Sequence, residues 1–376
     1  MSTFALRTAR ACLVAALLGL GAAAVPVASA AATQPGARAL LALQAHAATV
    51  TAAAAGAGWI ARDLSANGAL VDATSHKPNA GDTADAILAL VAARDGAKQV
   101  KAATYWLEQH FESYVSAKGV DNPGALGLVV LAAVAADADP ARFGGEASSN
   151  DLVARLQATE QLKGASAGVF GATSSANAFS QSLALLALIS VKGSATAIHL
   201  AQANLASRQC TDGGWEYSLS TPCAKADPKT YTGPDTNSTA LAVMAIVAAG
   251  GHFAHHPLTF FKSSQEADGS FGYYGVAGDG QKGDPDSTGE VIQALIALDA
   301  LNDPQFVRNG TTPEQALERF QYGCKSPVSE RGEFSYDGAP SQYATLQAVP
   351  AAAGVAFPFS ARMLSAAEPR LSCGAS

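Results

Sequence analysis

A short pattern recurs six times along this chain and constrains its fold more than any other feature. Each copy joins a tight glycine turn to a helix built mostly from Ala, Leu, Val and Ile. The two clearest turns, at 209–215 and 265–271, read Gln-Cys-Thr-Asp-Gly-Gly-Trp and Gln-Glu-Ala-Asp-Gly-Ser-Phe. One such unit cannot bury its apolar face alone, so the repeat predicts units that stack on their neighbours.

The six apolar helices are expected inside the stack, because a helix that is apolar on all sides is buried on all sides. Their predicted ranges are Asp82–Ala93, Pro123–Ala136, Ala178–Ser190, Thr236–Ala249, Ser287–Leu301 and Ser341–Ala353. The segments between them carry charged and amide side chains at helical spacing, which predicts outer helices with one face in solvent. Those ranges are Gly58–Ser65, Ala97–Val115, Asn150–Gln161, Thr196–Ser207, Pro257–Ser264 and Pro313–Tyr322.

Six helical hairpins predict an all-α fold, an (α/α)6 toroid whose inner helices surround a common axis. An open superhelix is the alternative, and it would need polar caps at both ends. Each outer helix ends at a glycine turn, and an apolar residue after the turn is expected to fill the seam between neighbouring hairpins. These six residues are Leu70, Val120, Val169, Trp215, Phe271 and Phe334.

Residues 1–30 have the features of a secretory signal. Arg7 and Arg10 precede an apolar run, and Ala28-Ser29-Ala30 supplies a small-residue cleavage site. A membrane anchor is the alternative, but the apolar run is short and is broken by glycines and a proline. We therefore expect a secreted protein without a stable membrane anchor.

The rest of the chain is expected to form one domain with two flanking segments. A partly ordered lead-in covers 31–53, the toroid covers 54–354 and a C-terminal tail covers 355–376. The chain holds 24 Lys and Arg against 31 Asp and Glu, and its basic residues form no stripe. This balance argues against nucleic acid and anionic membranes as partners.

The cysteines beyond the predicted signal are even in number, which in an exported chain indicates disulfides. Three pairings are possible. We expect Cys210–Cys223, which closes a local loop around the Trp215 turn, and Cys324–Cys373, which ties the tail to the last repeat. A thiolate metal site is the alternative, but the chain has no Cys-x-x-Cys motif, so no metal is expected.

At its two clearest turns the chain resembles the squalene/terpene cyclase and prenyltransferase repeat superfamily. The segments 209–215 and 265–271 are similar to that superfamily's Gln–Trp turn motif. The resemblance implies an α/α toroid over nearly all of 54–354. Cobalamin carriers of the intrinsic factor and transcobalamin type share this toroid, so the resemblance defines the fold better than the function.

An acidic segment at the start of one inner helix is a candidate catalytic site. Class II terpene cyclases of this superfamily protonate an alkene with the middle Asp of Asp-x-Asp-Asp-Thr, and residues 284–288 read Asp-Pro-Asp-Ser-Thr. The resemblance implies Asp286 as the proton donor beside Asp284, with Ser287 in place of the last acid. Such cyclases usually pair two helical domains, and this chain has one. Helix capping is the alternative role, because Asp, Ser and Thr are preferred N-caps.

Asp286 and Glu290 form a second candidate pair, because a spacing of four places them on one helix face. Paired acids in a cleft can hydrolyse glycosides, so a carbohydrate-active α/α-barrel enzyme is a further alternative. The simpler interpretation is two solvated acids in the first helical turn, where the helix dipole favours them.

Aromatic residues gather in the long loops of the last three repeats. Tyrosines there are expected at one mouth of the ring, because a phenol prefers one wet end. The predicted ligand-binding residues are Trp215, Tyr217, Tyr231, Tyr273, Tyr274, Tyr336 and Tyr343. We predict a non-catalytic binding module for a small hydrophobic or corrin-like ligand, cobalamin being one option, or for an extracellular protein partner. A reduced class II terpene cyclase that uses Asp286 is the main alternative, and neither function requires a cofactor.

Overall fold

The computed structural model describes one compact unit, made of residues 52–64, 68–227, 229–230, 232–278 and 281–365. The predicted signal, most of the predicted lead-in, Tyr231 and Cys373 lie outside these residues. Within the described ranges, no helix is both long enough and apolar enough to cross a membrane.

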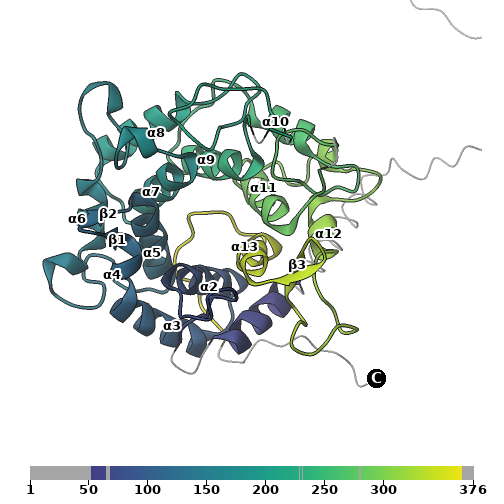
Figure 1. Cartoon of the computed structure of the whole chain (residues 1–376), viewed down its shortest axis with the longest axis horizontal. Coiled ribbons are helices and arrows are strands. Elements are labelled where there is room, and N and C mark those ends of the chain that lie inside the picture. Colours follow the sequence, from purple (N-terminus) through teal and green to yellow (C-terminus); the bar gives the residue numbers. More distant parts are fainter. Residues whose placement is uncertain (1–51, 65–67, 228, 231, 279–280, 366–376) are drawn as a thin grey trace, which may run out of the picture. The chain divides into compact units, whose positions relative to one another are not determined.

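Six inner helices of the described chain form a closed ring (Figure 1). They are α2 (Ala80–Ala93), α5 (Pro123–Ala135), α7 (Ala178–Ser190), α9 (Thr236–Ala248), α11 (Pro285–Ala297) and α13 (Gln342–Ala352). Each packs against the next, and α13 packs against α2. The fold is therefore the predicted (α/α)6 toroid and not the open superhelix. The helix ends differ from prediction by a few residues, most at α11, which begins and ends earlier than expected.

Outer helices cover the outside and lie between consecutive inner helices, as α8 does against α7 and α9. This layer contains the helical residues 52–63, α3 (Ala97–His110), α4 (Glu112–Val115), α6 (Leu152–Ala158), α8 (Ala195–Ala206), α10 (Pro257–Ser264) and α12 (Pro313–Glu318). The connecting loops hold short 3-10 turns, namely η1 (Ser148–Asn150), η2 (Gly164–Ser166), η3 (Thr173–Ser175) and η4 (Pro304–Phe306). They also hold two antiparallel hairpins, β1 (Ser116–Ala117) with β2 (Val120–Asp121) and β3 (Phe334–Tyr336) with β4 (Ala339–Ser341).

In four repeats of the described chain, the same hydrogen bond fixes the apolar residue of the seam to the next inner helix. The Trp215 amide donates to Oγ1 of Thr239 at 2.9 Å, and Thr239 is the fourth residue after the N-cap Asp235 of α9. A buried amide therefore has an acceptor that is part of the next repeat. The same contact, at 2.8–3.0 Å, joins Leu70 to Thr83, Phe271 to Thr288 and Phe334 to Thr345. These four apolar residues are fully buried, as predicted, and Val169 is buried too.

The second repeat departs from this pattern, and the prediction for Val120 is wrong. Val120 lies in β2 with 71 % of its surface exposed. Val115 fills the seam instead: it is fully buried, and its carbonyl accepts from the amide of the N-cap Asn122 at 2.8 Å. The physical reason is local, because the fourth residue after Asn122 is Leu126, which has no hydroxyl to accept from a glycine turn.

Three glutamines before the turns, Gln209, Gln265 and Gln321, join their repeats to the next one. The Nε2 group of Gln209 donates to the carbonyl of Gly213 in its own turn, at 3.0 Å, and to that of His255 in the next repeat, at 2.6 Å. The Nε2 group of Gln321 donates to the Ala52 carbonyl at 2.8 Å and so links the last repeat to the first. These side-chain amides therefore connect neighbouring repeats through backbone carbonyls.

The predicted disulfide between Cys210 and Cys223 is present, with a Cα–Cα distance of 5.6 Å, and closes the loop after the Trp215 turn. Cys324 is also disulfide-bonded. Its predicted partner lies outside the described residues, so that pairing stays a prediction.

Candidate functional site

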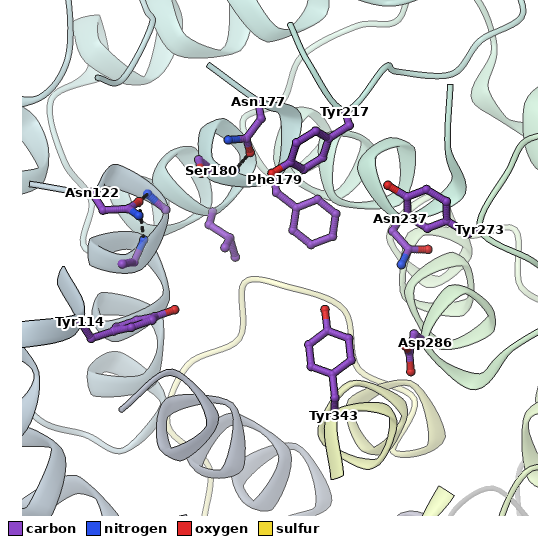
Figure 2. A pocket seen from close by; sticks show the side chains of 13 residues that line it. Tyr114, Asn122, Asn177, Phe179, Ser180, Tyr217, Asn237, Tyr273, Asp286 and Tyr343 are labelled. Atoms are coloured by element: carbon purple, nitrogen blue, oxygen red, sulfur yellow. Dashed lines mark hydrogen bonds between the residues drawn. The ribbon is translucent and has the colours of Figure 1, made fainter. Parts of the chain in front are cut away.

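The ring interior holds two adjoining cavities. The upper cavity, of about 490 Å³, lies at the N-terminal ends of the inner helices, and the lower one, of about 210 Å³, lies beneath it. Tyr114, Phe179, Leu183 and Tyr343 line both cavities and so connect them. Figure 2 shows that aromatic rings from different helices point into the upper cavity, whose other lining residues are Asn122, Gly124, Ala125, Asn177, Ser180, Tyr217, Asn237, Tyr273 and Asp286.

The chain after α13 crosses the opposite end of the ring (Figure 1). Phe357 of this segment lines the lower cavity. Further along, the Ser365 amide donates to the Arg94 carbonyl at 2.9 Å, and the Ala97 amide donates to the Ser365 carbonyl at 3.2 Å. These bonds anchor the segment between α2 and α3. The segment therefore covers the lower end of the interior, and a ligand would enter from the upper end.

Carboxyl groups gather on the arc of the interior formed by α11, α13 and α2, which we call the acid arc. Asp286 and Glu290 of α11 line the upper and the lower cavity, respectively, and Asp85 of α2 lines the lower one. Burial, with a smaller contribution from Asp284, raises the pKa of Asp286 to about 8. Burial, with the nearby Asp85 and Asp286, raises the pKa of Glu290 to about 8. Both carboxyls are mainly neutral at pH 7.

Several oxygens on the acid arc have no hydrogen-bond partner among the described residues. They are Oδ1 of Asp286, Oε2 of Glu290, Oε1 of Gln293 and Oε1 of Gln347. The first three residues are 6 %, 4 % and 1 % exposed. A buried polar atom without a partner costs about 1–3 kcal/mol. A ligand that donates hydrogen bonds here would offset that cost.

The opposite arc, formed by α5, α7 and α9, is apolar in its lower part. Leu128, Leu183 and Leu241 line the lower cavity there, together with Phe179. Helices α5 and α7 approach closely, because a Cβ on Gly127 would lie only 2.7 Å from the carbonyl carbon of Leu183. The interior therefore has one polar, acidic wall and one apolar wall.

Only some of the predicted site residues line the two cavities. Asp286, Tyr217, Tyr273 and Tyr343 line the upper cavity, and Glu290 lines the lower one. Of the remaining described candidates, Trp215, Tyr274 and Tyr336 do not line either cavity, and Asp284 is not a cavity residue either. Tyr231 lies outside the described residues.

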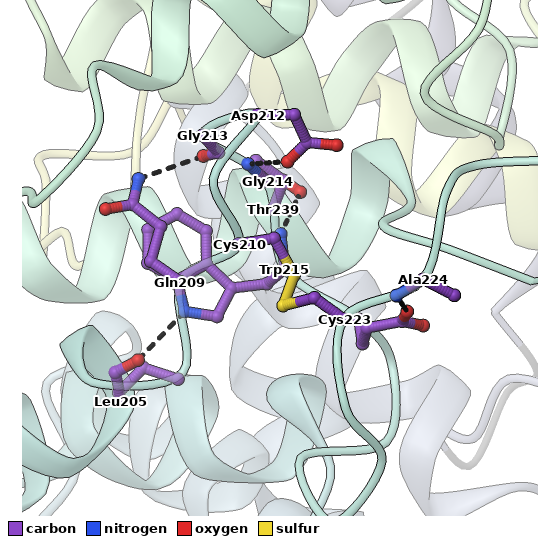
Figure 3. The surroundings of a disulfide bond; sticks show 11 residues. Leu205, Gln209, Cys210, Asp212, Gly213, Gly214, Trp215, Cys223, Ala224 and Thr239 are labelled. Carbon is purple, nitrogen blue, oxygen red and sulfur yellow. Dashed lines mark hydrogen bonds between the residues drawn. A yellow bond between two sulfur atoms is a disulfide. The ribbon is translucent and has the colours of Figure 1, made fainter.

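Trp215 and Asp284 have structural roles that explain their positions. Trp215 is fully buried in its seam, where its indole Nε1 donates to the Leu205 carbonyl at 2.8 Å (Figure 3). Asp284 caps α11, because its Oδ1 accepts from the Ser287 amide at 2.7 Å and its Oδ2 accepts from the Ser287 hydroxyl at 2.9 Å. The capping interpretation thus fits Asp284, whereas Asp286 faces the interior.

Sequence reasoning missed several residues of the interior, among them Asp85, Tyr114, Phe179, Gln293 and Gln347. The sequence does contain a pattern that points to the polar ones. Each lies three or four positions from another polar residue of the same inner helix, as Gln293 does from Glu290, so the two share one helix face. Tyr114 and Phe179 gave no such signal. Among the described residues, no three His, Cys, Asp or Glu side chains are grouped so that they could hold a metal ion.

Comparison with known proteins identifies the class of fold. No protein-family model matches the sequence, and no curated protein matches it. The structure is similar to that of a variant of the type II terpene cyclase MstE from Scytonema in complex with the product merosterolic acid A. The TM-score is 0.52 and the identity 12 %, and the match covers 85 % of this chain and 99 % of that chain. The chain thus has the α/α toroid fold of a type II terpene cyclase. The ring of this chain covers nearly the whole of that cyclase chain.

Proposed function

We propose that the protein is a non-catalytic binding module that holds a small, mainly apolar ligand inside the ring. The observation that carries this proposal is a cavity covered at one end, with aromatic and apolar walls and unpartnered buried oxygens on one arc. Its size falls in the range of about 300–1,000 Å³ typical of sites for drug-sized ligands. Of the ligands expected from the sequence, this favours a small hydrophobic molecule over a corrin.

The acid–base properties of Asp286 favour binding over catalysis. A group that protonates an alkene must carry a proton and must also release it readily, because an alkene is a very weak base. Burial gives Asp286 a pKa of about 8, so it carries the proton but releases it weakly. Asp284, which the resemblance places beside the donor, is occupied with capping α11.

A reduced type II terpene cyclase with Asp286 as proton donor is the second candidate. It is supported by the position of Asp286 in an aromatic cavity and by the similarity in fold to a cyclase built on one ring. A glycoside hydrolase has less support, because Asp286 and Glu290 project from one helix and do not flank a cleft.

An incubation with linear isoprenoids such as squalene and farnesol separates the two candidates. Asn resembles a neutral Asp in shape but cannot release a proton, so Asp286→Asn removes catalysis and leaves the cavity nearly unchanged. We expect no cyclised product by gas chromatography from either protein. A cyclised product that disappears in Asp286→Asn would overturn the binding proposal and favour the cyclase.

We further propose that the protein acts outside the cell. The signal features of residues 1–30 and the Cys210–Cys223 disulfide support export, because disulfides persist in oxidising compartments. N-terminal sequencing of the protein from culture medium tests this. A mature chain that begins near Ala31 is expected, and a chain retained in cells with Met1 intact would contradict export.

A further inference from the structure

We infer that the ligand of the ring is an organic cation, an ammonium group on an apolar body, whose charged end lies in the lower cavity against Glu290 and Asp85. This inference rests on the proposed function, since it specifies the chemistry of the molecule that the interior binds.

The lower cavity gathers carboxyl groups that have no basic side chain beside them. Asp85 of α2 and Glu290 of α11 line it from different helices, with Tyr343 of α13 also in its wall. Asp85 and Asp286 lie near enough to Glu290 to raise its pKa, so the three carboxyls act on one another. None of the described residues that line the two cavities is Lys, Arg or His. A bound cation would favour the ionised form of Glu290, whose proton would pass to solvent, and would then pair with the carboxylate.

The hydrogen-bond acceptors of the lower cavity point to the same chemistry independently of charge. Oε2 of Glu290, Oε1 of Gln293 and Oε1 of Gln347 lack partners among the described residues, and all three side chains line this cavity. Gln293 is neutral and 1 % exposed, so its unpartnered oxygen is not a consequence of the acidic cluster. An ammonium group offers three donors, whereas a hydroxyl offers one.

The remaining walls fit the rest of such a molecule. The rings of Tyr114, Phe179 and Tyr343 line both cavities, and aromatic faces attract organic cations. Leu128 and Leu241 on the apolar arc can contact a hydrocarbon body. A carboxylate ligand offers only acceptors, so it would gain no hydrogen bond from the acceptor oxygens of Gln293 and Gln347.

Isothermal titration calorimetry with three ligands of one chain length tests the inference: octylammonium, octanol and octanoate. At pH 7 we expect octylammonium to bind roughly tenfold or more tightly than octanol, because a charge-assisted hydrogen bond is about twice as strong as a neutral one. Octanoate is expected not to bind.

Variants make the test specific to the acid arc. Glu290→Gln keeps the shape of the neutral acid, and we expect it to weaken octylammonium binding by about tenfold while octanol changes less than about twofold. Asp85→Asn should act in the same direction. Glu160→Gln is the matched control, since Glu160 is a buried acid that does not line either cavity. Thermal unfolding confirms that each variant is folded.

The outcomes distinguish this inference from the proposed function. If octanol binds as tightly as octylammonium, or if Glu290→Gln leaves octylammonium binding unchanged, the cation inference is wrong. The same holds if octylammonium does not bind. A neutral molecule found in the protein from its native source would then still support the binding module, whereas only the absence of any ligand would contradict both.

Discussion

Buried polar groups in the seams between hairpins and in the ring interior differ in whether they have hydrogen-bond partners. In the seams, the Trp215 amide has an acceptor on Thr239, and the Gln209 amide donates to two carbonyls. In the interior, Glu290 and Gln293 keep oxygens without a partner among the described residues. Outside the cavities, Oε1 of Gln265, both carboxyl oxygens of Glu160 and the hydroxyls of Ser182 and Ser238 also lack partners among the described residues, so the contrast is one of degree. The paired groups of the seams stabilise the ring, whereas the unpartnered oxygens of the interior cost stability, as expected for the ligand site that we propose.

The largest expected effect tests the seams. Trp215→Ala removes a fully buried indole, and we expect the free energy of unfolding to fall by about 3–5 kcal/mol. Val120→Ala is the matched control outside a seam, and it should change that free energy by less than about 0.5 kcal/mol. Urea denaturation measures both. If the two substitutions lower the free energy of unfolding by similar amounts, the Trp215 seam does not stabilise the ring more than the exposed Val120 position does.

The second prediction concerns the cost of the interior. The pKa of Glu290 is about 8 in the folded protein, above its ordinary value of 4.5. Between these values the folded state holds a proton that the unfolded state has lost, so stability falls as pH rises, by about 1.4 kcal/mol per pH unit, and levels off above about pH 8. Asp85 and Asp286 act in the same direction.

Glu290→Gln removes that contribution because the amide does not ionise. We expect the variant to be more stable than the original protein at pH 8, by roughly 2–4 kcal/mol, and to lose less stability between pH 5 and 8. Urea denaturation at pH 5, 6.5 and 8 gives the three free energies. If the two proteins lose stability in parallel, Glu290 does not carry a proton in the folded interior.

The smallest expected effect concerns the hydrogen bond between the Trp215 amide and Thr239. Thr239→Val keeps the side-chain shape but removes the acceptor of the Trp215 amide, and we expect a loss of about 1–2 kcal/mol. Thr259→Val, at an exposed position of α10, is the control and should be nearly neutral. Hydrogen exchange offers a direct readout, because the Trp215 amide should exchange faster in Thr239→Val. Unchanged exchange would contradict the role of the hydroxyl.

The parts of the structure that depend on neighbouring residues could be predicted from the sequence. Runs of small apolar side chains predicted all six inner helices. The short loop around Trp215 predicted the Cys210–Cys223 disulfide. Val120 was misplaced because Gly119 resembles the other glycine turns, whereas Leu126 lacks the hydroxyl that the regular seams use.

The site was only partly predictable. Asp286 and Glu290 were found because they stand near the start of one helix. Asp85 and Tyr114 were missed because they meet Glu290 or Tyr343 only after the ring closes, and closure joins residues more than two hundred positions apart. Side chains that face a common axis depend on the packing of all six repeats, which no local pattern specifies.

Native mass spectrometry of the protein purified from its own source shows directly whether the ring holds a ligand. We expect a small molecule bound to the folded protein, and its loss from Leu183→Trp, which would fill the space where both cavities meet. Circular dichroism would establish that this variant is folded. A folded protein that carries no small molecule, or one whose bound molecule persists in Leu183→Trp, would contradict a ligand site inside the ring.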